Sequence, residues 1–391
     1  MKIEHVDFHY LADDAIRDIG DGSQDALLVH VVMDDGSEGW GECEAAPLVS
    51  IAAWCCPMSH LACKPLKASV IGFEINKPAD IYALTDKVRR NSFDLLQADH
   101  TLSGIDIALW DMLGKKLGEP VWKLLGYDRA YPKTAYASQL FGDTPQQTYD
   151  QAVQSRKDGF RAAKFGWGPF GRGTVQNDIA HIEAAREGLG PDLALMIDAG
   201  TVWVNDVARA EAVVPALLKV KAVWLEEPFV SGALRAYAAL SEQSGCAGLL
   251  AAGEGSHDPD MAYNLIDFGK LGFIQIDTGR IGGISSAKKV AEYAERTGTV
   301  YVNHTFTTSL ALSASIQPFA GLKNSPWCEF PVESAPPSRL LTVKRIMPDA
   351  DGKIQLPDSP GLGVEIDPGT IERYGREVTI TYEKQTIWSM K

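Results

Sequence analysis

Eight short apolar segments recur along residues 134–329, and each ends in a polar residue. Successive polar ends lie 23 to 34 residues apart, which is room for one strand, one helix and two loops. Eight β-then-α units in a row predict a closed parallel (β/α) barrel, an α/β fold of the modified TIM type. The eighth segment has the weakest strand pattern. The segments are TAYAS (134–138), FRAAK (160–164), LALMID (193–198), AVWLE (222–226), LLAAGE (249–254), GFIQID (272–277), TVYVNH (299–304) and PWCE (326–329).

The stretches between these segments have helical patterns. TPQQTYDQAVQSRKDG begins with a threonine cap and a proline and ends with glycine, and GISSAKKVAEYAERTG has apolar residues at a spacing of three to four. DVARAEAVVPALLKV is also helical, but Pro215 interrupts it. Residues 1–125 differ, because two strands flank a DDGSEG turn and helices are predicted over 78–90 and 103–118. We therefore expect a separate N-terminal α+β domain.

Composition argues against several classes of protein. Hydrophobic residues make up 45% of 391, so a full core can form, and the net charge of −14 argues against a nucleic-acid or anionic-membrane partner. The start, MKIEHVDFHY, lacks the apolar segment of a signal peptide, and no apolar run reaches the length of a membrane span. The six cysteines include no CxxC pair, which favours a reduced, cytoplasmic protein over a zinc site.

Three successive segments end in acids: Asp198, Glu226 and Glu254. Strand ends of a parallel barrel share one rim, so these carboxylates would repel one another unless a cation lies between them. Oxygen ligands suit a hard ion, Mg²⁺ first. For any single acid a helix cap or a solvated loop charge is an equal alternative, but three in register favour the metal site. Glu227 adjoins Glu226 and would face the other way, so one of the two reaches the ion.

Asp277 and His304 end the sixth and seventh segments, which should be neighbours. An aspartate that holds one imidazole nitrogen fixes the tautomer and raises the basicity of the other, so His304 is a candidate general base. The alternative is a histidine satisfied within a strand-end network. Glu329 could be a buried protonated donor or a loop acid, and both remain open. Lys164 and Ser138 lie on the same rim as candidate substrate contacts.

The chain resembles the enolase superfamily, and within it the mandelate racemase/muconate lactonizing enzyme-like subgroup of the acid-sugar dehydratase type. The motifs that carry the resemblance span most of the chain. They are SGIDIALWDMLGKKLGEPVWKLLG (103–126), MIDAG (196–200), WLEEP (224–228), AAGEG (251–255), QIDTGRIGGIS (275–285) and VNHTF (302–306). The resemblance implies a capping domain (1–125), a barrel (126–345) and a C-terminal segment (346–391) that returns to the capping domain.

The resemblance also implies roles for individual residues. Asp198, Glu226 and Glu254 would bind Mg²⁺, Asp277 with His304 would form the base dyad, and Glu329 would hydrogen-bond the substrate carboxylate. The subgroup often ends its second strand in Lys-X-Lys, with the second lysine as another base, but this chain has Lys164, Phe165 and Gly166. Lys164 would then be an electrostatic clamp on the carboxylate. The missing lysine puts two-base racemisation in doubt.

With one base left, the best fit is dehydration of an acid sugar to a 2-keto-3-deoxy acid. The alternatives are an epimerase, racemase or cycloisomerase with an unrecognised second base and, more remotely, a non-catalytic metal-binding scaffold. The substrate would be a small carboxylate, and we expect a homo-oligomer. Specificity should come from capping-domain loops at residues 15–24 and 44–63, where Trp54 and His60 are candidate substrate contacts. The alternative is that Trp54 only packs the cap.

Overall fold

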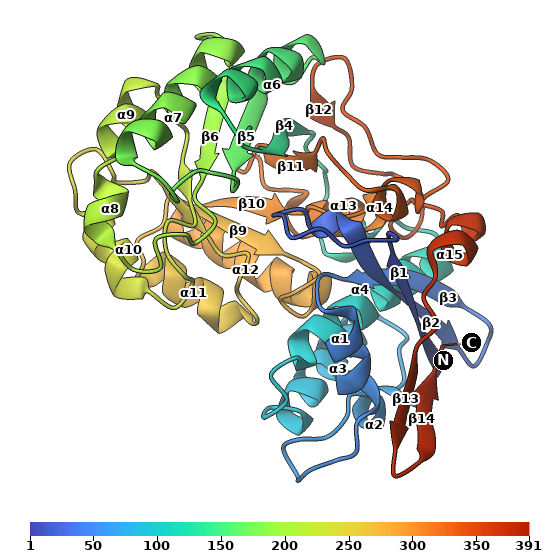
Figure 1. The fold of residues 1–391 in the computed structure, drawn as a ribbon. Coiled ribbons are helices and arrows are strands. Elements are labelled where there is room, and N and C mark those ends of the chain that lie inside the picture. Colours follow the sequence, from blue (N-terminus) through green and yellow to red (C-terminus); the bar gives the residue numbers. More distant parts are fainter. Residues whose placement is uncertain (391) are drawn as a thin grey trace.

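The computed structural model describes residues 1–390 as a parallel barrel with a smaller α+β domain beside its rim (Figure 1). The predicted (β/α) barrel is confirmed, and each of the eight predicted segments overlaps a barrel strand. In hydrogen-bonded order the sheet runs β10-β9-β8-β7-β6-β5-β4-β11. The strands are β4 (Lys133–Leu140), β5 (Ala162–Gly166), β6 (Ala194–Asp198), β7 (Leu225–Glu226), β8 (Leu250–Ala252), β9 (Phe273–Asp277), β10 (Val300–His304) and β11 (Trp327–Pro331).

The barrel is nearly closed, because β10 and β11 meet without a paired ladder within residues 1–390. Side chains connect the two strands instead. The Glu329 backbone N–H donates to Asn303 Oδ1 at 3.0 Å, and the Tyr301 N–H donates to Ser325 Oγ at 3.1 Å. The carboxyl ends of β10 and β11 therefore stay together, which places His304 and Glu329 on one stretch of the rim.

Helices cover the outside of the barrel (Figure 1). The cap of α6 is the predicted one, since the Thr144 and Gln147 side chains each accept from the other's backbone N–H. The segment around Pro215 is broken into two short helices, as its proline implies. The helices are α6 (Pro145–Lys157), α7 (Val175–Leu189), α8 (Val207–Glu211), α9 (Val214–Lys219), α10 (Leu234–Ser241), α11 (Pro259–Asp267), α12 (Gly283–Thr297) and α13 (Ser309–Ile316).

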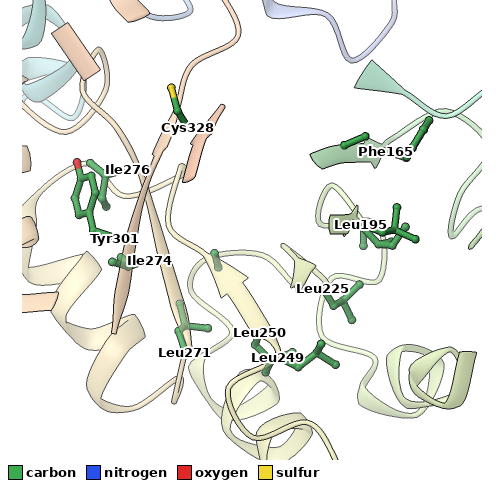
Figure 2. Close-up of a cluster of buried hydrophobic side chains, with 14 of the residues drawn as sticks. Phe165, Leu195, Leu225, Leu249, Leu250, Leu271, Ile274, Ile276, Tyr301 and Cys328 are labelled. Carbon is green, nitrogen blue, oxygen red and sulfur yellow. The ribbon is translucent and has the colours of Figure 1, made fainter. Parts of the chain in front are cut away.

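Because side chains alternate along a strand, those of the barrel strands point either outward to the helices or inward to the barrel interior. Phe165, Leu195 and Leu225 belong to the large apolar cluster that joins strands to helices (Figure 2). Their neighbours Met196 and Trp224 fill the barrel interior in a second cluster. The last residues of β6 and β7, Asp198 and Glu226, lie two positions beyond Met196 and Trp224, so they share this interior face and reach the rim.

The smaller domain is a three-stranded antiparallel sheet packed on helices, with β1 (Ile3–Ala12), β2 (Asp25–Met33), β3 (Glu38–Cys43), α1 (Pro47–Cys55), α2 (Lys67–Val70), α3 (Pro78–Asn91) and α4 (Ala98–Leu117). The backbones of α4 and β3 touch, because a Cβ on Gly41 would lie 2.0 Å from the Gly104 carbonyl oxygen. Among the described residues, no helix has both the length and the apolar character needed to cross a membrane.

The C-terminal segment serves both domains. Its β12 (Lys353–Ile354) pairs with the barrel strand β4. Residues farther on, α15 (Pro368–Tyr374) and the hairpin of β13 (Thr379–Tyr382) and β14 (Gln385–Ser389), lie beside the cap sheet (Figure 1). There Trp388 contacts Phe8 edge-on, with ring centroids 6.5 Å apart.

Candidate active site

A cleft of about 380 Å³ lies between the barrel rim and the cap. Residues 18–22 and Glu44 line it from the cap, and the ends of the barrel strands line it from below. A larger cavity of about 900 Å³ adjoins it and shares Ile19, Leu140 and Phe306 with it. The smaller cleft contains the titratable strand-end residues, so it is the candidate active site.

The three acids predicted to bind a metal lie on adjacent strands. Asp198 and Glu226 are register partners at the ends of β6 and β7, while Glu254 lies two residues beyond the end of β8. Burial and the charge of Glu226 raise the pKa of Asp198 well above its usual range. Burial also raises the pKa of Glu226, although Lys164 opposes the shift. Confining the two negative charges together is therefore unfavourable.

Lys164 lies among these acids and forms three ion pairs. Its Nζ lies 2.5 Å from Glu226 Oε1, 2.8 Å from Glu329 Oε1 and 3.6 Å from Asp198 Oδ2. Burial alone would lower the pKa of Lys164, but Glu226 and Glu329 outweigh it and raise that pKa well above its usual range. Lys164 is therefore a buried, fully charged cation at the floor of the cleft.

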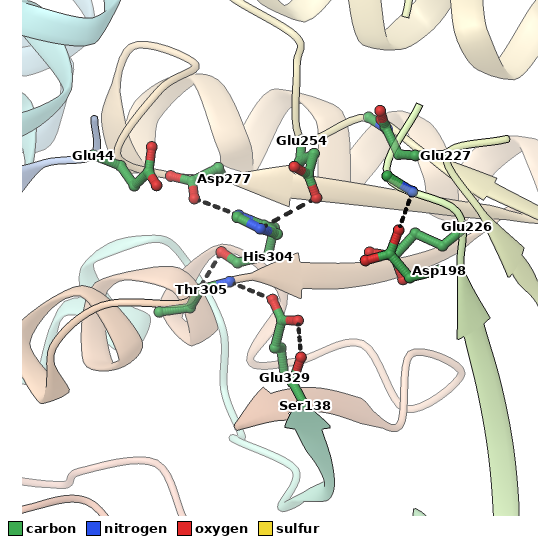
Figure 3. A network of polar contacts seen from close by, with 12 residues as sticks. Glu44, Ser138, Asp198, Glu226, Glu227, Glu254, Asp277, His304, Thr305 and Glu329 are labelled. Atoms are coloured by element: carbon green, nitrogen blue, oxygen red, sulfur yellow. Dashed lines mark hydrogen bonds and ion pairs between the residues drawn. The ribbon is translucent and has the colours of Figure 1, made fainter. Parts of the chain in front are cut away.

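His304 bridges two carboxylates (Figure 3). Its Nδ1 lies 2.6 Å from Asp277 Oδ2 and its Nε2 lies 3.2 Å from Glu254 Oε2. Asp277 is itself held by the Gly279 backbone N–H at 2.7 Å. Burial lowers the pKa of His304, but the charges of Glu254, Glu329 and Asp277 outweigh it and raise the pKa to about 10. Asp277 fixes the ring so that Nε2 faces the cleft.

Glu329 connects Lys164 to the β4 side of the rim. Ser138 Oγ donates to its Oε1 at 2.8 Å and the Thr305 backbone N–H donates to its Oε2 at 2.6 Å (Figure 3). Burial raises the pKa of Glu329, but Lys164 and His304 outweigh it and lower the pKa overall. Glu329 is thus an ionised acceptor, so the alternative of a protonated donor is not supported. Ser138 acts on the site by orienting Glu329.

The acids fit a hard divalent cation in their chemistry. All three candidate ligands, Asp198, Glu226 and Glu254, offer only oxygen atoms, which Mg²⁺ prefers. No group of three His, Cys, Asp or Glu side chains is gathered as a metal cage in residues 1–390. The reason is local: Glu226 turns to Lys164 and Glu254 turns to His304. The repulsion that raises the pKa of Asp198 is what a bound cation would relieve.

The structure adds groups to the site that the sequence did not single out. Arg280, three residues beyond Asp277, places Nε 2.5 Å from Glu44 Oε2 and Nη1 3.5 Å from Glu254 Oε1. It thereby ties the cap to the rim. The signal was present in the QIDTGRIGG motif, which has an arginine in the loop after the sixth strand. Trp167, in the loop after β5, also lines the cleft.

Trp54 and His60 do not reach the cleft, contrary to the expectation of substrate contacts. Trp54 is buried in the cap core, with its ring centroid 5.5 Å from that of Phe8. His60 is half-exposed on the cap surface, where its Nε2 lies 3.1 Å from Asp94 Oδ2. The apolar stretch that contains Trp54 forms α1, whose buried face packs against α4 and β1. Of the two expected loops, the cleft takes the middle of 15–24 and only the start of 44–63.

Known proteins share both halves of this arrangement. Residues 19–126 match the mandelate racemase / muconate lactonizing enzyme N-terminal domain, and residues 147–370 match the enolase C-terminal domain-like family. D-galactarolactone cycloisomerase from Agrobacterium fabrum is 30% identical over 89% of this chain and 90% of its own. Arabinonate dehydratase from Saccharolobus solfataricus is 25% identical over 92% and 93%.

A solved structure, described as a predicted mandelate racemase from Rhodobacter sphaeroides, is 51% identical. It has a TM-score of 0.95 over 100% of this chain and 99% of that one. The candidate site residues lie at or near the carboxyl ends of successive barrel strands, in the order of the sequence motifs. The chain therefore belongs to the enolase superfamily, in its mandelate racemase/muconate lactonizing enzyme group, whose similar members include acid-sugar dehydratases, cycloisomerases and racemases.

Proposed function

We propose that this chain is a Mg²⁺-dependent enzyme that removes the proton α to the carboxylate of an acid sugar and dehydrates it to a 2-keto-3-deoxy acid. One observation carries the choice of reaction. A single imidazole, that of His304, lines the cleft and is oriented by Asp277, while Gly166 stands at the position to which the family resemblance assigns a second lysine base. Superfamily members bind Mg²⁺, and the oxygen-only acids fit that ion.

His304, Lys164 and the three acids have separate roles in this reaction. His304 Nε2 takes the α-proton, so His304 must first lose the proton on Nε2. That loss becomes easier when Glu254 no longer faces the ring, because the pKa of His304 then falls. Lys164 offsets the negative charge that grows on the substrate carboxylate as the proton leaves. Asp198, Glu226 and Glu254 would hold Mg²⁺, which would supply further positive charge for that same carboxylate when bound.

Dehydration then balances with one acid–base group. The electron pair of the α C–H bond forms a carbon–carbon double bond as the β C–O bond breaks. His304 returns its proton to the departing hydroxyl, so that water leaves. The enol that remains tautomerises to the 2-keto-3-deoxy acid. This sequence requires the α-hydrogen and the β-hydroxyl on the same face of the substrate, the face toward His304.

A cycloisomerase is the second candidate. The 30% identical relative is named D-galactarolactone cycloisomerase, and opening a lactone by elimination also begins with removal of an α-proton. A racemase is less favoured because it needs a base on each face. A non-catalytic scaffold is disfavoured because the charged lysine, the oriented imidazole and the three acids are all in place on one rim.

The first test is the histidine. His304→Gln should abolish turnover and α-proton exchange in D₂O, with a loss of at least about a hundredfold, because nothing else on that face takes the proton. Exchange is followed by NMR over a panel of aldonic acids, aldaric acids and their lactones. His60→Gln, which alters a cap histidine outside the cleft, is the matched control and should keep activity. Residual exchange from one α-epimer in His304→Gln would instead reveal a second base and support the racemase.

The second test is the ion. Mg²⁺ should raise the melting temperature, because it binds the folded acids and relieves their repulsion; at a hundred times Kd the gain is about 2.7 kcal/mol. Asp198→Asn should reduce this gain, and Asp192→Asn, on an exposed loop, should keep it. Calorimetry with and without chelator measures both. Equal melting temperatures at saturating Mg²⁺ would show that the acids do not bind the ion.

A further inference from the structure

Trp167 has an unusual backbone in the cleft wall. It follows Gly166 directly, and its φ is +57°, in the left-handed region. Bulky side chains rarely adopt that region, and holding one there costs about 1–3 kcal/mol. The indole lines the cleft and is 36% exposed. Glycine or asparagine would hold the same turn with less strain, so the strained turn by itself gives no reason for a tryptophan.

The indole is held between the two domains. A Cβ on Gly20, in the cap loop, would lie 2.8 Å from Trp167 Cγ, and a Cβ on Gly200, just beyond Asp198, would lie 2.8 Å from Trp167 Cδ2. All three nearest atoms around the Gly20 position belong to Trp167. The cap loop therefore rests directly on the indole, and the rim supports the indole from the other side.

Trp167 differs in chemistry from the cleft residues around it. Lys164, Asp198 and His304 present charged groups, whereas Trp167 presents an apolar ring next to the position where Gly166 leaves no base. β5, which leads to Trp167, is separated from β10 by β4 and β11, so the indole stands across the rim from His304. A wall of this kind excludes water from the substrate and packs against carbon-bound hydrogens.

We propose that Trp167 is a specificity-determining residue whose indole receives the C–H face of the bound acid sugar, on the side away from His304. The inference rests on the proposed function for its substrate class. It adds that the indole fills the side that a second base would occupy and that the cap loop closes onto the substrate through Gly20 and Trp167. An acid sugar whose hydroxyls face the indole binds poorly, because those groups lose their hydrogen bonds with water.

The experiment begins with the wild-type protein and Mg²⁺. Exchange of an α-proton from any acid of the panel establishes the proposed function, and its absence overturns that function. With the best substrate of the panel, Trp167→Asn should raise KM about tenfold or more and leave kcat within a few-fold, because a wall binds substrate and transition state alike. Its melting temperature should be unchanged or higher, because asparagine tolerates the left-handed turn. An unchanged KM in the folded variant would overturn the proposal.

Trp203→Phe is the matched control. Trp203 is buried in the next loop, packs on Phe170 and does not line the cleft, so its loss should leave KM unchanged. Substrate should also alter tryptophan emission in the wild type and in Trp203→Phe but not in Trp167→Asn. If the emission change persists in Trp167→Asn, the substrate does not contact the indole and the proposal fails.

A double-mutant cycle tests the contact with the cap. Gly20→Ala should raise KM several-fold in the wild type, because the new methyl group meets the indole. In the Trp167→Asn background the same change should have little further effect, because the obstacle is gone. If Gly20→Ala raised KM by the same factor in both backgrounds, the two effects would be independent and the cap loop would not close through Trp167.

Discussion

Gly166 shows why a second base is missing from the β5 side of the rim. A Cβ at this position would lie 2.7 Å from Asp198 Oδ2 and 2.9 Å from its Cγ, closer than real Cβ atoms approach. The two residues are register partners on β5 and β6. In the present arrangement a lysine here would require the side chain of Asp198, a proposed metal ligand, to shift.

We expect Gly166→Ala to weaken Mg²⁺ binding by about tenfold or more, because the methyl group pushes Asp198 out of place. Gly166→Lys should likewise lose activity and gain no racemase activity. Gly173→Ala, in the loop that follows β5, is the control, because its Cβ would meet only Asn177 Nδ2 at 4.0 Å. Calorimetric titration with Mg²⁺ measures the affinities. Wild-type affinity in Gly166→Ala would show that Asp198 has room to move or does not bind the ion.

At the residue scale, strand-end residues could be predicted and cross-domain contacts could not. Asp277 and His304 were paired from the sequence because neighbouring strands bring their ends together. The Arg280–Glu44 ion pair joins positions 236 apart in the chain, and nothing local indicates it. For Trp54, the expected substrate contact is wrong and the alternative of packing in the cap holds, because its apolar surroundings suit a packed helix as well as a substrate loop.

At the element scale, the spacing of the apolar segments predicted all eight barrel strands but not their lengths. β7 spans only Leu225–Glu226 and β8 only Leu250–Ala252, so Glu254 lies in a loop and not at a strand end. The weakest predicted segment forms the full strand β11, because contacts with other parts of the fold stabilise it. β11 pairs with β4 on one side, and Lys133 donates a hydrogen bond to the carbonyl oxygen of Ser325, just before β11.

Lys133 on β4 is fully buried and donates to the carbonyl oxygens of Phe319, Leu322 and Ser325 at 2.9, 2.9 and 3.0 Å. Lys133→Met should lower the free energy of unfolding by about 3 kcal/mol or more, because it leaves those carbonyls unpaired. Lys323→Met, at an exposed position in the same loop, should change stability by less than about 0.5 kcal/mol. Urea unfolding compares the two. Equal stabilities would show that water replaces the ammonium.

At the scale of the whole molecule, function depends on how the cap sits on the barrel, and a buried acid contributes to that interface. Asp106 on α4 accepts from the Ser285 backbone N–H at the start of α12, at 3.0 Å, and from Ser285 Oγ. The approach is close: a Cβ on Gly283, whose φ is +85°, would lie 2.3 Å from Asp106 Oδ1. Glycine at 283 therefore lets the cap helix and the barrel helix meet.

This interface should make stability depend on pH. Burial raises the pKa of Asp106 to about 7, although hydrogen bonds from Ser285 oppose the shift. An unfolded aspartate has a pKa of about 3.9, so between these values the folded chain holds a proton that the unfolded chain has released. The stabilising contribution is therefore complete below about pH 4 and is lost as the pH rises through 7.

From pH 5 to pH 8, the wild type should lose about 2–3 kcal/mol of unfolding free energy relative to Asp106→Asn, which cannot titrate. Urea unfolding of both proteins in chelator at several pH values measures the difference and keeps metal binding out of it. Asp192→Asn, at an exposed position, should follow the wild type at every pH. Parallel pH profiles for the wild type and Asp106→Asn would mean that Asp106 stays ionised at the interface, where the Ser285 N–H and hydroxyl would then be enough to hold its charge between the cap and the barrel.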